Sequence, residues 1–137
     1  MAAKEGSIPT RKTSSMFRDT KAFSSFSVND LQQAKEFYGQ RLGLKVVESY
    51  EGLELHLAGG QRVFLYPKPN HEPASFTVLN FHVNNIDEAV EELVSLGIGL
   101  EHYNLPDIKT DEKGIMRGPG PKLAWFKDPA NNILSVV

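Results

Sequence analysis

The sequence predicts an α+β fold made of two βαβββ modules in tandem. Three observations favour it: apolar residues alternate along several short segments, they recur at helical spacing along two longer ones, and the same order of segments occurs twice. Phe81 and Val83 in the second copy follow Phe26 and Val28 in the first at a spacing of 55 residues. A repeat of about this length indicates two copies of one supersecondary unit.

The first module is expected at residues 22–66. A strand at 23–28 precedes a helix, which Asp30 and Gln33 begin with capping-box spacing and Gly43 ends. The helix carries an apolar stripe formed by Leu31, Ala34, Phe37, Tyr38 and Leu42. Three strands follow, at residues 44–50, 53–58 and 62–66. The proline-rich linker 67–76 cannot continue the last of them.

The second module is expected at residues 77–137. A strand at 77–83 leads into a helix at 86–96, which begins after Asn85 and stops at Gly97. The remaining strands are expected at residues 98–103, 123–127 and 132–137. Between them lies a loop, residues 104–122, that contains glycine and proline. A loop that long inside a compact domain is usually a lid, a binding loop or disordered.

Composition limits the possible functions. The 137 residues suit a single domain, and the absence of cysteine excludes disulfides, thiol catalysis and thiolate metal sites. A net charge of −2 offers no basic field for nucleic acid. No apolar run approaches the roughly 18 residues that span a bilayer. We therefore expect a cytoplasmic protein that binds neither nucleic acid nor membrane.

Residues 1–21 differ in composition from the rest of the chain. They hold five Lys or Arg against two Asp or Glu, are rich in Ser and Thr, and show no helical or strand period. We expect a flexible tail before the domain at 22–137; an organelle-targeting peptide is the alternative.

Two segments carry a resemblance to a known family. Val28-Asn-Asp30-Leu31, with Phe37-Tyr38 and Leu42-Gly43-Leu44 after it, resembles the opening of a vicinal oxygen chelate module, and the segment from Phe126 through Asp128-Pro129 to Asn132-Ile133 resembles its ending. That superfamily includes glyoxalase I, bleomycin-resistance proteins and extradiol dioxygenases. The resemblance covers residues 22–137. It implies that the two sheets lie side by side as an incomplete barrel, with the helices outside and a cavity inside, but it does not imply one activity.

The resemblance also implies where a metal ion would bind. Metalloenzymes of this superfamily place ligands at four positions, which here fall on Phe23, on Val78, within 63–66 and on Ser135. No histidine or carboxylate stands at any of them, and aromatic and aliphatic side chains offer no lone pair. We therefore expect no metal ion and no other cofactor.

Strand alternation indicates which side chains line the implied cavity. The apolar set Leu79, Phe81 and Val83 belongs against the helices, so Asn80 and His82 should face the cavity. The same parity selects the remaining candidates, and the complete set of expected ligand-binding residues is Ser25, Ser27, Asn80, His82, Trp125 and Ser135. His82 is the best candidate for a catalytic group, with a hydrogen-bonded structural role as the alternative. Trp125 is either a stacking wall or a plug in the core.

The other histidines have plainer interpretations. His56 and Glu54 share a strand face that is more readily a solvated surface or a dimer contact than a displaced metal site. His71 is expected to be exposed in the linker, and His102 faces either the cavity mouth or water.

These observations favour a protein that binds a small organic molecule without a metal ion. One alternative is a lyase, isomerase or dioxygenase-type enzyme with a non-standard site, including a metal-free acid–base catalyst that uses His82. Another is a degenerate scaffold or regulatory domain. Open strand edges suggest a homodimer.

Overall fold

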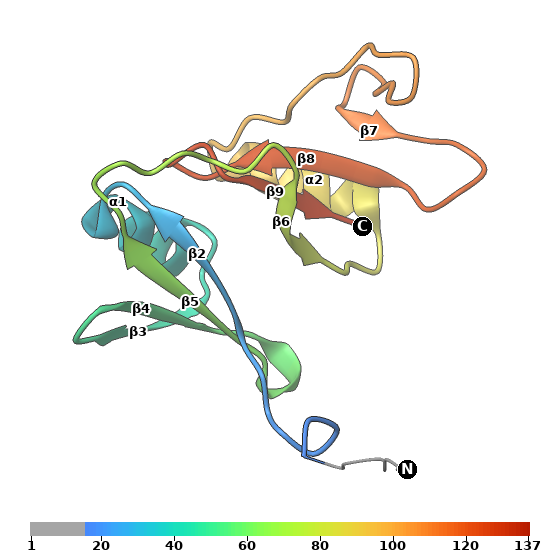
Figure 1. Cartoon of the computed structure of the whole chain (residues 1–137). Coiled ribbons are helices and arrows are strands. Elements are labelled where there is room, and N and C mark those ends of the chain that lie inside the picture. Colours follow the sequence, from blue (N-terminus) through green and yellow to red (C-terminus); the bar gives the residue numbers. More distant parts are fainter. Residues whose placement is uncertain (1–15) are drawn as a thin grey trace, which may run out of the picture.

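The computed structural model describes residues 16–137, which form two four-stranded sheets and the helices that cover them (Figure 1). The first module contains β2 (Ser24–Val28), α1 (Leu31–Lys35), η1 (Glu36–Arg41), β3 (Lys45–Ser49), β4 (Gly52–His56), η2 (Ala58–Gly60) and β5 (Arg62–Pro67). The second contains β6 (Thr77–Phe81), α2 (Ile86–Ser95), β7 (Ile115–Met116), β8 (Leu123–Lys127) and β9 (Ile133–Val136). The expected tail at residues 1–21 lies mostly outside the described residues.

Strand order confirms the tandem βαβββ prediction. The sheets run β2-β5-β4-β3 and β6-β9-β8-β7, so the first strand of each module pairs with the fourth, the fourth with the third and the third with the second. The pairs β2–β5 and β6–β9 are parallel, and the other pairs are antiparallel. The two sheets share no hydrogen-bonded strand pair and do not close into a barrel.

Both helices begin where the sequence predicts. The side chains of Asp30 and Asn85 accept hydrogen bonds from the third residue beyond them, each at 3.0 Å. Gly43 and Gly97 end the two helical segments with φ of +77° and +80°, a conformation that glycine adopts without strain. The first helix does not keep the expected 3.6-residue period, because from Glu36 onward it widens into a π-helical segment.

The prediction of a strand at residues 98–103 is wrong. Only one backbone hydrogen bond ties this segment to the sheet, from the Glu101 amide to the Trp125 carbonyl at 2.8 Å. The same edge of β8 pairs instead with the two-residue strand β7, which lies inside the expected loop 104–122. Because one strand edge accepts one partner at a time, β7 leaves too little of β8 for the predicted strand.

The loop 104–122 is held by ion pairs as well as by β7. Arg117 donates to Asp87 on α2 at 2.7 Å and to Asp111 at 2.8 Å. The Arg117 guanidinium lowers the pKa of Asp111 to about 2, because it stabilises the ionised carboxylate. The loop is therefore anchored to the start of α2.

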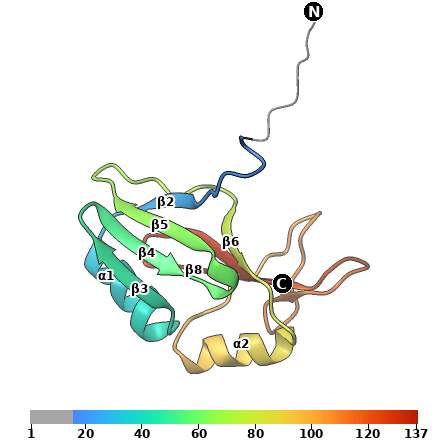
Figure 2. The same cartoon turned by 90° about the horizontal axis from the view of Figure 1, so that it is seen from below.

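Helices cover only one side of the sheets. Figure 2 shows α1 and α2 on the same side of the two sheets. Buried residues of both modules form one continuous apolar core on that side, including Tyr38, Leu55 and Leu65 from the first module and Phe126 and Leu134 from the second. The other face of each sheet carries no helix of residues 16–137, and we call these two surfaces the open faces. Among the same residues, no helix is long and apolar enough to cross a membrane.

Candidate functional site

The open face of the first sheet combines polar and aromatic side chains. In the strand register, Ser25 lies beside Phe64, which lies beside Glu54, and Ser27 lies beside Tyr66. Alternation explains this, because the intervening residues of the same strands point into the core. The Phe64 and Tyr66 rings lie nearly parallel, with an interplanar angle of 18° and centroids 6.4 Å apart. They form a flat aromatic surface.

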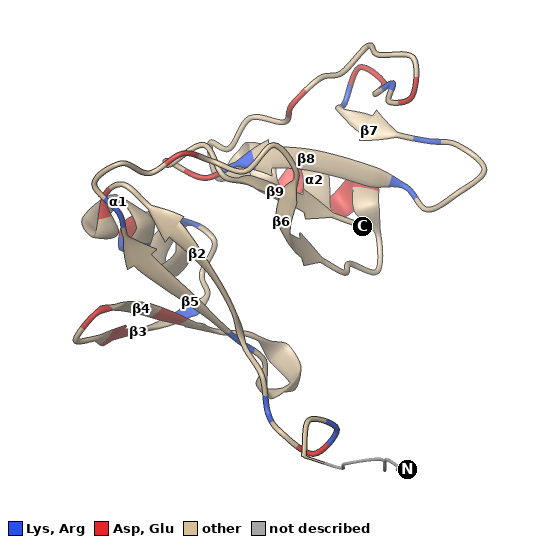
Figure 3. Ribbon diagram, viewed as in Figure 1, with Lys and Arg blue, Asp and Glu red and all other residues tan. Residues whose placement is uncertain are grey.

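A hollow of about 770 Å³ adjoins this aromatic surface. It is lined by aromatic, charged and glycine residues: Phe23, Glu51, Glu54, Gly59, Gly60, Arg62 and Phe64, with Lys21, Ala22, Gln61 and Val63. Glu54 also lies 3.1 Å from Nε2 of His56. Figure 3 shows acidic residues along the β3–β4 hairpin that forms one side of this region. The hollow therefore offers apolar contact area together with hydrogen-bonding groups of both charges.

The open face of the second sheet brings three predicted site residues into one row. Trp125, Ser135 and Asn80 are neighbours across β8, β9 and β6, and the Ser135 hydroxyl donates to the Asn80 side-chain oxygen. The Trp125 indole donates to the Thr77 hydroxyl at 3.2 Å. Ser135 is 0% exposed and Trp125 is 9% exposed. Asn80 is therefore the exposed polar group of this row.

Two contacts hold the Trp125 side chain in place, and its role as a stacking wall for a ligand stays a prediction. The edge of Tyr103 packs against its ring, with centroids 5.5 Å apart and an interplanar angle of 78°. This contact and the bond to Thr77 fix the indole in place.

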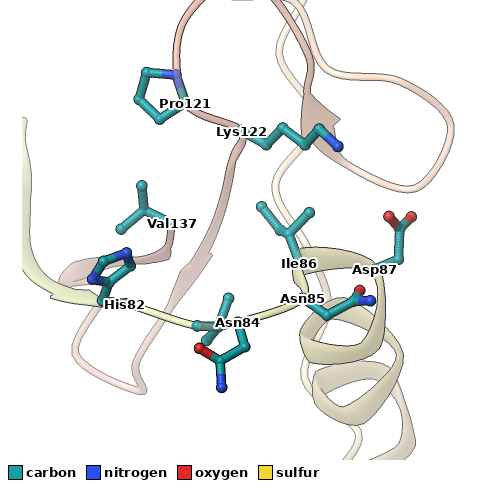
Figure 4. Close-up of a pocket in the computed structure, with 9 residues that line it drawn as sticks. His82, Asn84, Asn85, Ile86, Asp87, Pro121, Lys122 and Val137 are labelled. Atoms are coloured by element: carbon teal, nitrogen blue, oxygen red, sulfur yellow. The ribbon is translucent and has the colours of Figure 1, made fainter.

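His82 lies apart from that row. Backbone hydrogen bonds from Val137 to Phe81 and from Val83 to Val137, both 2.9 Å, continue the strand pairing past β6, and His82 is exposed there. It lines a polar hollow of about 320 Å³ at the start of α2, together with Asn84, Asp87 and Lys122 (Figure 4). None of the other predicted site residues lines this hollow.

A buried polar network joins the two modules. Asp128, in the turn between β8 and β9, accepts hydrogen bonds from the Tyr38 hydroxyl at 2.7 Å and from the Asn132 side chain at 3.0 Å. Asn132 donates in turn to the backbone carbonyl of Ser27 at 2.9 Å. The Asp-Pro turn, which the sequence associates with a family motif, thus connects the second module to the helix and first strand of the first.

The prediction that His71 is simply exposed is wrong. Its Nδ1 lies 2.6 Å from the Ser27 hydroxyl and its Nε2 lies 2.9 Å from the Ala130 carbonyl. The linker therefore packs against the β8–β9 turn and places the imidazole between the modules. Phe64 and Tyr66 were also absent from the predicted site, although their alternation within 62–66 is visible in the sequence.

The network predicts a specific loss of stability at alkaline pH. Burial raises the pKa of Tyr38 above its usual value of 10, and the nearby Asp128 carboxylate adds to this. The contribution of Tyr38 to the free energy of unfolding is complete below pH 10. Above pH 10 the unfolded chain loses the Tyr38 proton, whereas the folded chain retains it. The free energy of unfolding should then fall by about 1.4 kcal/mol per pH unit from this group. The free energy of unfolding, measured by urea denaturation at several values between pH 9 and 11, should fall less steeply with pH for Tyr38→Phe than for the unmodified chain. An equal dependence on pH in the two proteins would contradict the raised pKa of Tyr38.

The donor set does not fit the metal site that the family implies. At the corresponding positions, Phe23 and Val78 offer only carbon, β5 contributes no carboxylate or imidazole, and the Ser135 hydroxyl is buried and donates to Asn80. Within residues 16–137, no three His, Asp or Glu side chains come together in an arrangement that could hold a metal ion.

Comparison with known proteins agrees with the fold. The family model of the Glyoxalase/Bleomycin resistance protein/Dioxygenase superfamily matches residues 23–136. A glyoxalase family protein from Enterococcus faecalis superposes with a TM-score of 0.64 at 23% identity, over 88% of this chain and 98% of that one. An antibiotic binding protein from Streptomyces sp. CB03234 gives 0.61 at 20% identity, over 86% and 95% of the two chains.

A third structure extends the range of similar proteins. The genomically encoded fosfomycin resistance protein from Listeria monocytogenes gives a TM-score of 0.63 at 15% identity, over 86% of this chain and 91% of that one. No curated protein sequence matches the chain.

Proposed function

We propose that this chain, which belongs to the Glyoxalase/Bleomycin resistance protein/Dioxygenase superfamily, binds a small organic molecule. The molecule has a flat aromatic part, and the chain uses no metal ion to bind it. The observation that carries this proposal is the aromatic surface of Phe64 and Tyr66 beside a hollow of about 770 Å³. The volume lies in the range that is typical of ligand pockets, which combine apolar walls with a few polar groups. Here Glu54 and Arg62 supply the polar groups.

Binding explains the residues better than metal chemistry does. A metal enzyme of this family needs several nitrogen or carboxylate ligands in one cavity, and the corresponding positions of this chain lack them. Of the structurally similar proteins, one is named an antibiotic binding protein and another a fosfomycin resistance protein. These likenesses support the class of ligand and leave its identity to experiment.

We further propose that the protein is a homodimer. The open faces of both sheets, with Ser25 and Ser27 on one and Asn80, Ser135 and Trp125 on the other, have no second layer within residues 16–137. A second copy could cover them and bring the exposed side chains of Ser25 and Asn80 to one ligand. Sedimentation at micromolar concentration should give a dimer, and a monomer would contradict this part of the proposal.

Fluorescence titration tests the ligand proposal, because Trp125 is the one tryptophan of the chain. We expect saturable changes with flat aromatic compounds and none with non-aromatic compounds of similar size. Phe64→Ala should weaken aromatic binding about tenfold, since one aromatic pair contributes up to roughly 1.5 kcal/mol. Tyr50→Ala, at a fully exposed turn residue, is the matched control and should bind normally. No response to any compound would favour the scaffold alternative.

A further inference from the structure

The contacts of His71 fix which of its nitrogens carries the proton. The Ala130 carbonyl oxygen can only accept a hydrogen bond, so Nε2, at 2.9 Å, must carry the hydrogen in the neutral ring. Nδ1 is then unprotonated and accepts from the Ser27 hydroxyl at 2.6 Å. The serine hydroxyl thus points its proton at a basic nitrogen whose ring is held from the other side.

We propose that Ser27 and His71 form a nucleophile and general base that hydrolyse a carboxylic ester. Three features define such a site: a hydroxyl within hydrogen-bond reach of an imidazole, an imidazole oriented by a third acceptor, and access for a substrate. The first two are the contacts above. Both residues are partly exposed, which supplies the third.

The neighbours of Ser27 indicate the class of substrate. Tyr66 lies beside Ser27 in the parallel pairing of β2 and β5, is 37% exposed, and stacks with Phe64. An aromatic ring lying on this surface would place an attached ester group next to the serine hydroxyl. The inference rests on the proposed function, since the same open face holds the aromatic part of the molecule.

The reaction balances with water as the co-reactant. The Ser27 oxygen forms a bond to the ester carbonyl carbon while its proton passes to Nδ1 of His71. The bond from that carbon to the leaving oxygen then breaks, and His71 returns the proton to release an alcohol. A water molecule, deprotonated by His71, next attacks the acylated serine, and the acid leaves as the serine recovers its proton.

The absence of cysteine from the chain allows a direct test. In Ser27→Cys the new thiol is the only one, and the imidazole beside it should favour the reactive thiolate. We expect iodoacetamide at pH 6.5 to alkylate this variant at least tenfold faster than Ser25→Cys, whose residue lies on the same strand and the same open face. Adding His71→Gln to Ser27→Cys should abolish the difference. Equal rates for the two cysteine variants would overturn the proposal.

Ester hydrolysis by the unmodified residues completes the experiment. With p-nitrophenyl benzoate as the probe, Ser24→Ala, at an exposed serine of the same strand that has no part in the proposed site, should retain activity, while Ser27→Ala and His71→Gln should each lose at least about a hundredfold, the lower range for general base catalysis. Binding of flat aromatic compounds, followed by Trp125 fluorescence, should persist in Ser27→Ala. If binding persists but no variant alters hydrolysis, the ester proposal fails and the binding proposal stands; if binding is absent altogether, the binding proposal fails.

Discussion

Replacing Asp128 with alanine is expected to lower the free energy of unfolding by about 3 to 5 kcal/mol, the usual loss when one partner of a buried charged network is removed. The carboxylate accepts four hydrogen bonds: from the Tyr38 hydroxyl, from the backbone amides of Ala130 and Asn132, and from the Asn132 side chain. Asp128 is 3% exposed, so its four donors are shielded from bulk water in the folded chain.

Two effects oppose each other in this substitution. Removing a buried carboxylate relieves its desolvation cost, but it leaves four donors without an acceptor, each costing about 1 to 3 kcal/mol. The lost hydrogen bonds therefore dominate. Asp128→Asn, which keeps the shape but has one accepting oxygen fewer, should lie between Asp128→Ala and the unmodified chain.

Urea denaturation measures this effect, with Asp107→Ala as the control at an exposed aspartate. The control should change the free energy of unfolding by no more than about 0.5 kcal/mol. Because the network joins Tyr38 in the first module to the turn of the second, Asp128→Ala should also make the unfolding transition less cooperative. A loss below about 1 kcal/mol would mean that the network does not hold the modules together.

Gly52→Ala is expected to destabilise the first sheet by about 3 kcal/mol, as overpacking of a filled site does. A methyl group on Gly52 would lie 2.0 Å from the Leu65 carbonyl oxygen and 3.0 Å from the Phe64 ring. The first atom belongs to the backbone of the neighbouring strand, so β5 itself would have to move. The gain of roughly 0.4 to 1 kcal/mol from a less flexible unfolded chain is too small to compensate.

This substitution should also weaken aromatic binding, because it displaces the Phe64 ring from the surface it forms with Tyr66. Gly99→Ala is the matched control, since a methyl group there would meet nothing within 4 Å. Urea denaturation and fluorescence titration of both variants provide the two measurements. Unchanged stability in Gly52→Ala would show that β4 and β5 are not packed as described.

Local signals in the sequence were sufficient for the fold. The caps at Asp30 and Asn85 and the stops at Gly43 and Gly97 act within a few residues of where they stand, and the repeat at 55 residues places them in the same order twice. The error at residues 98–103 has a non-local cause, because the decision depends on which segment reaches the edge of β8. Apolar alternation alone cannot decide that competition.

The candidate site was likewise only partly predictable from the sequence. Strand parity predicted that Asn80 and Ser135 face the ligand cavity; the register makes them neighbours, and ligand binding by them stays a prediction. The role of His71 could not be predicted, because its partners lie 44 and 59 residues away in the sequence. A histidine in a proline-rich linker carries no local sign of such contacts.

Titration of the Trp125 fluorescence with flat aromatic compounds before and after exhaustive chelation tests the central claim most directly. The claim is that this member of the superfamily binds its ligand with aromatic and polar side chains alone. Saturable binding with the same affinity in both samples, and less than one equivalent of metal in the untreated protein by elemental analysis, is the result we expect. Binding that disappears on chelation and returns with one equivalent of a divalent ion would contradict the claim.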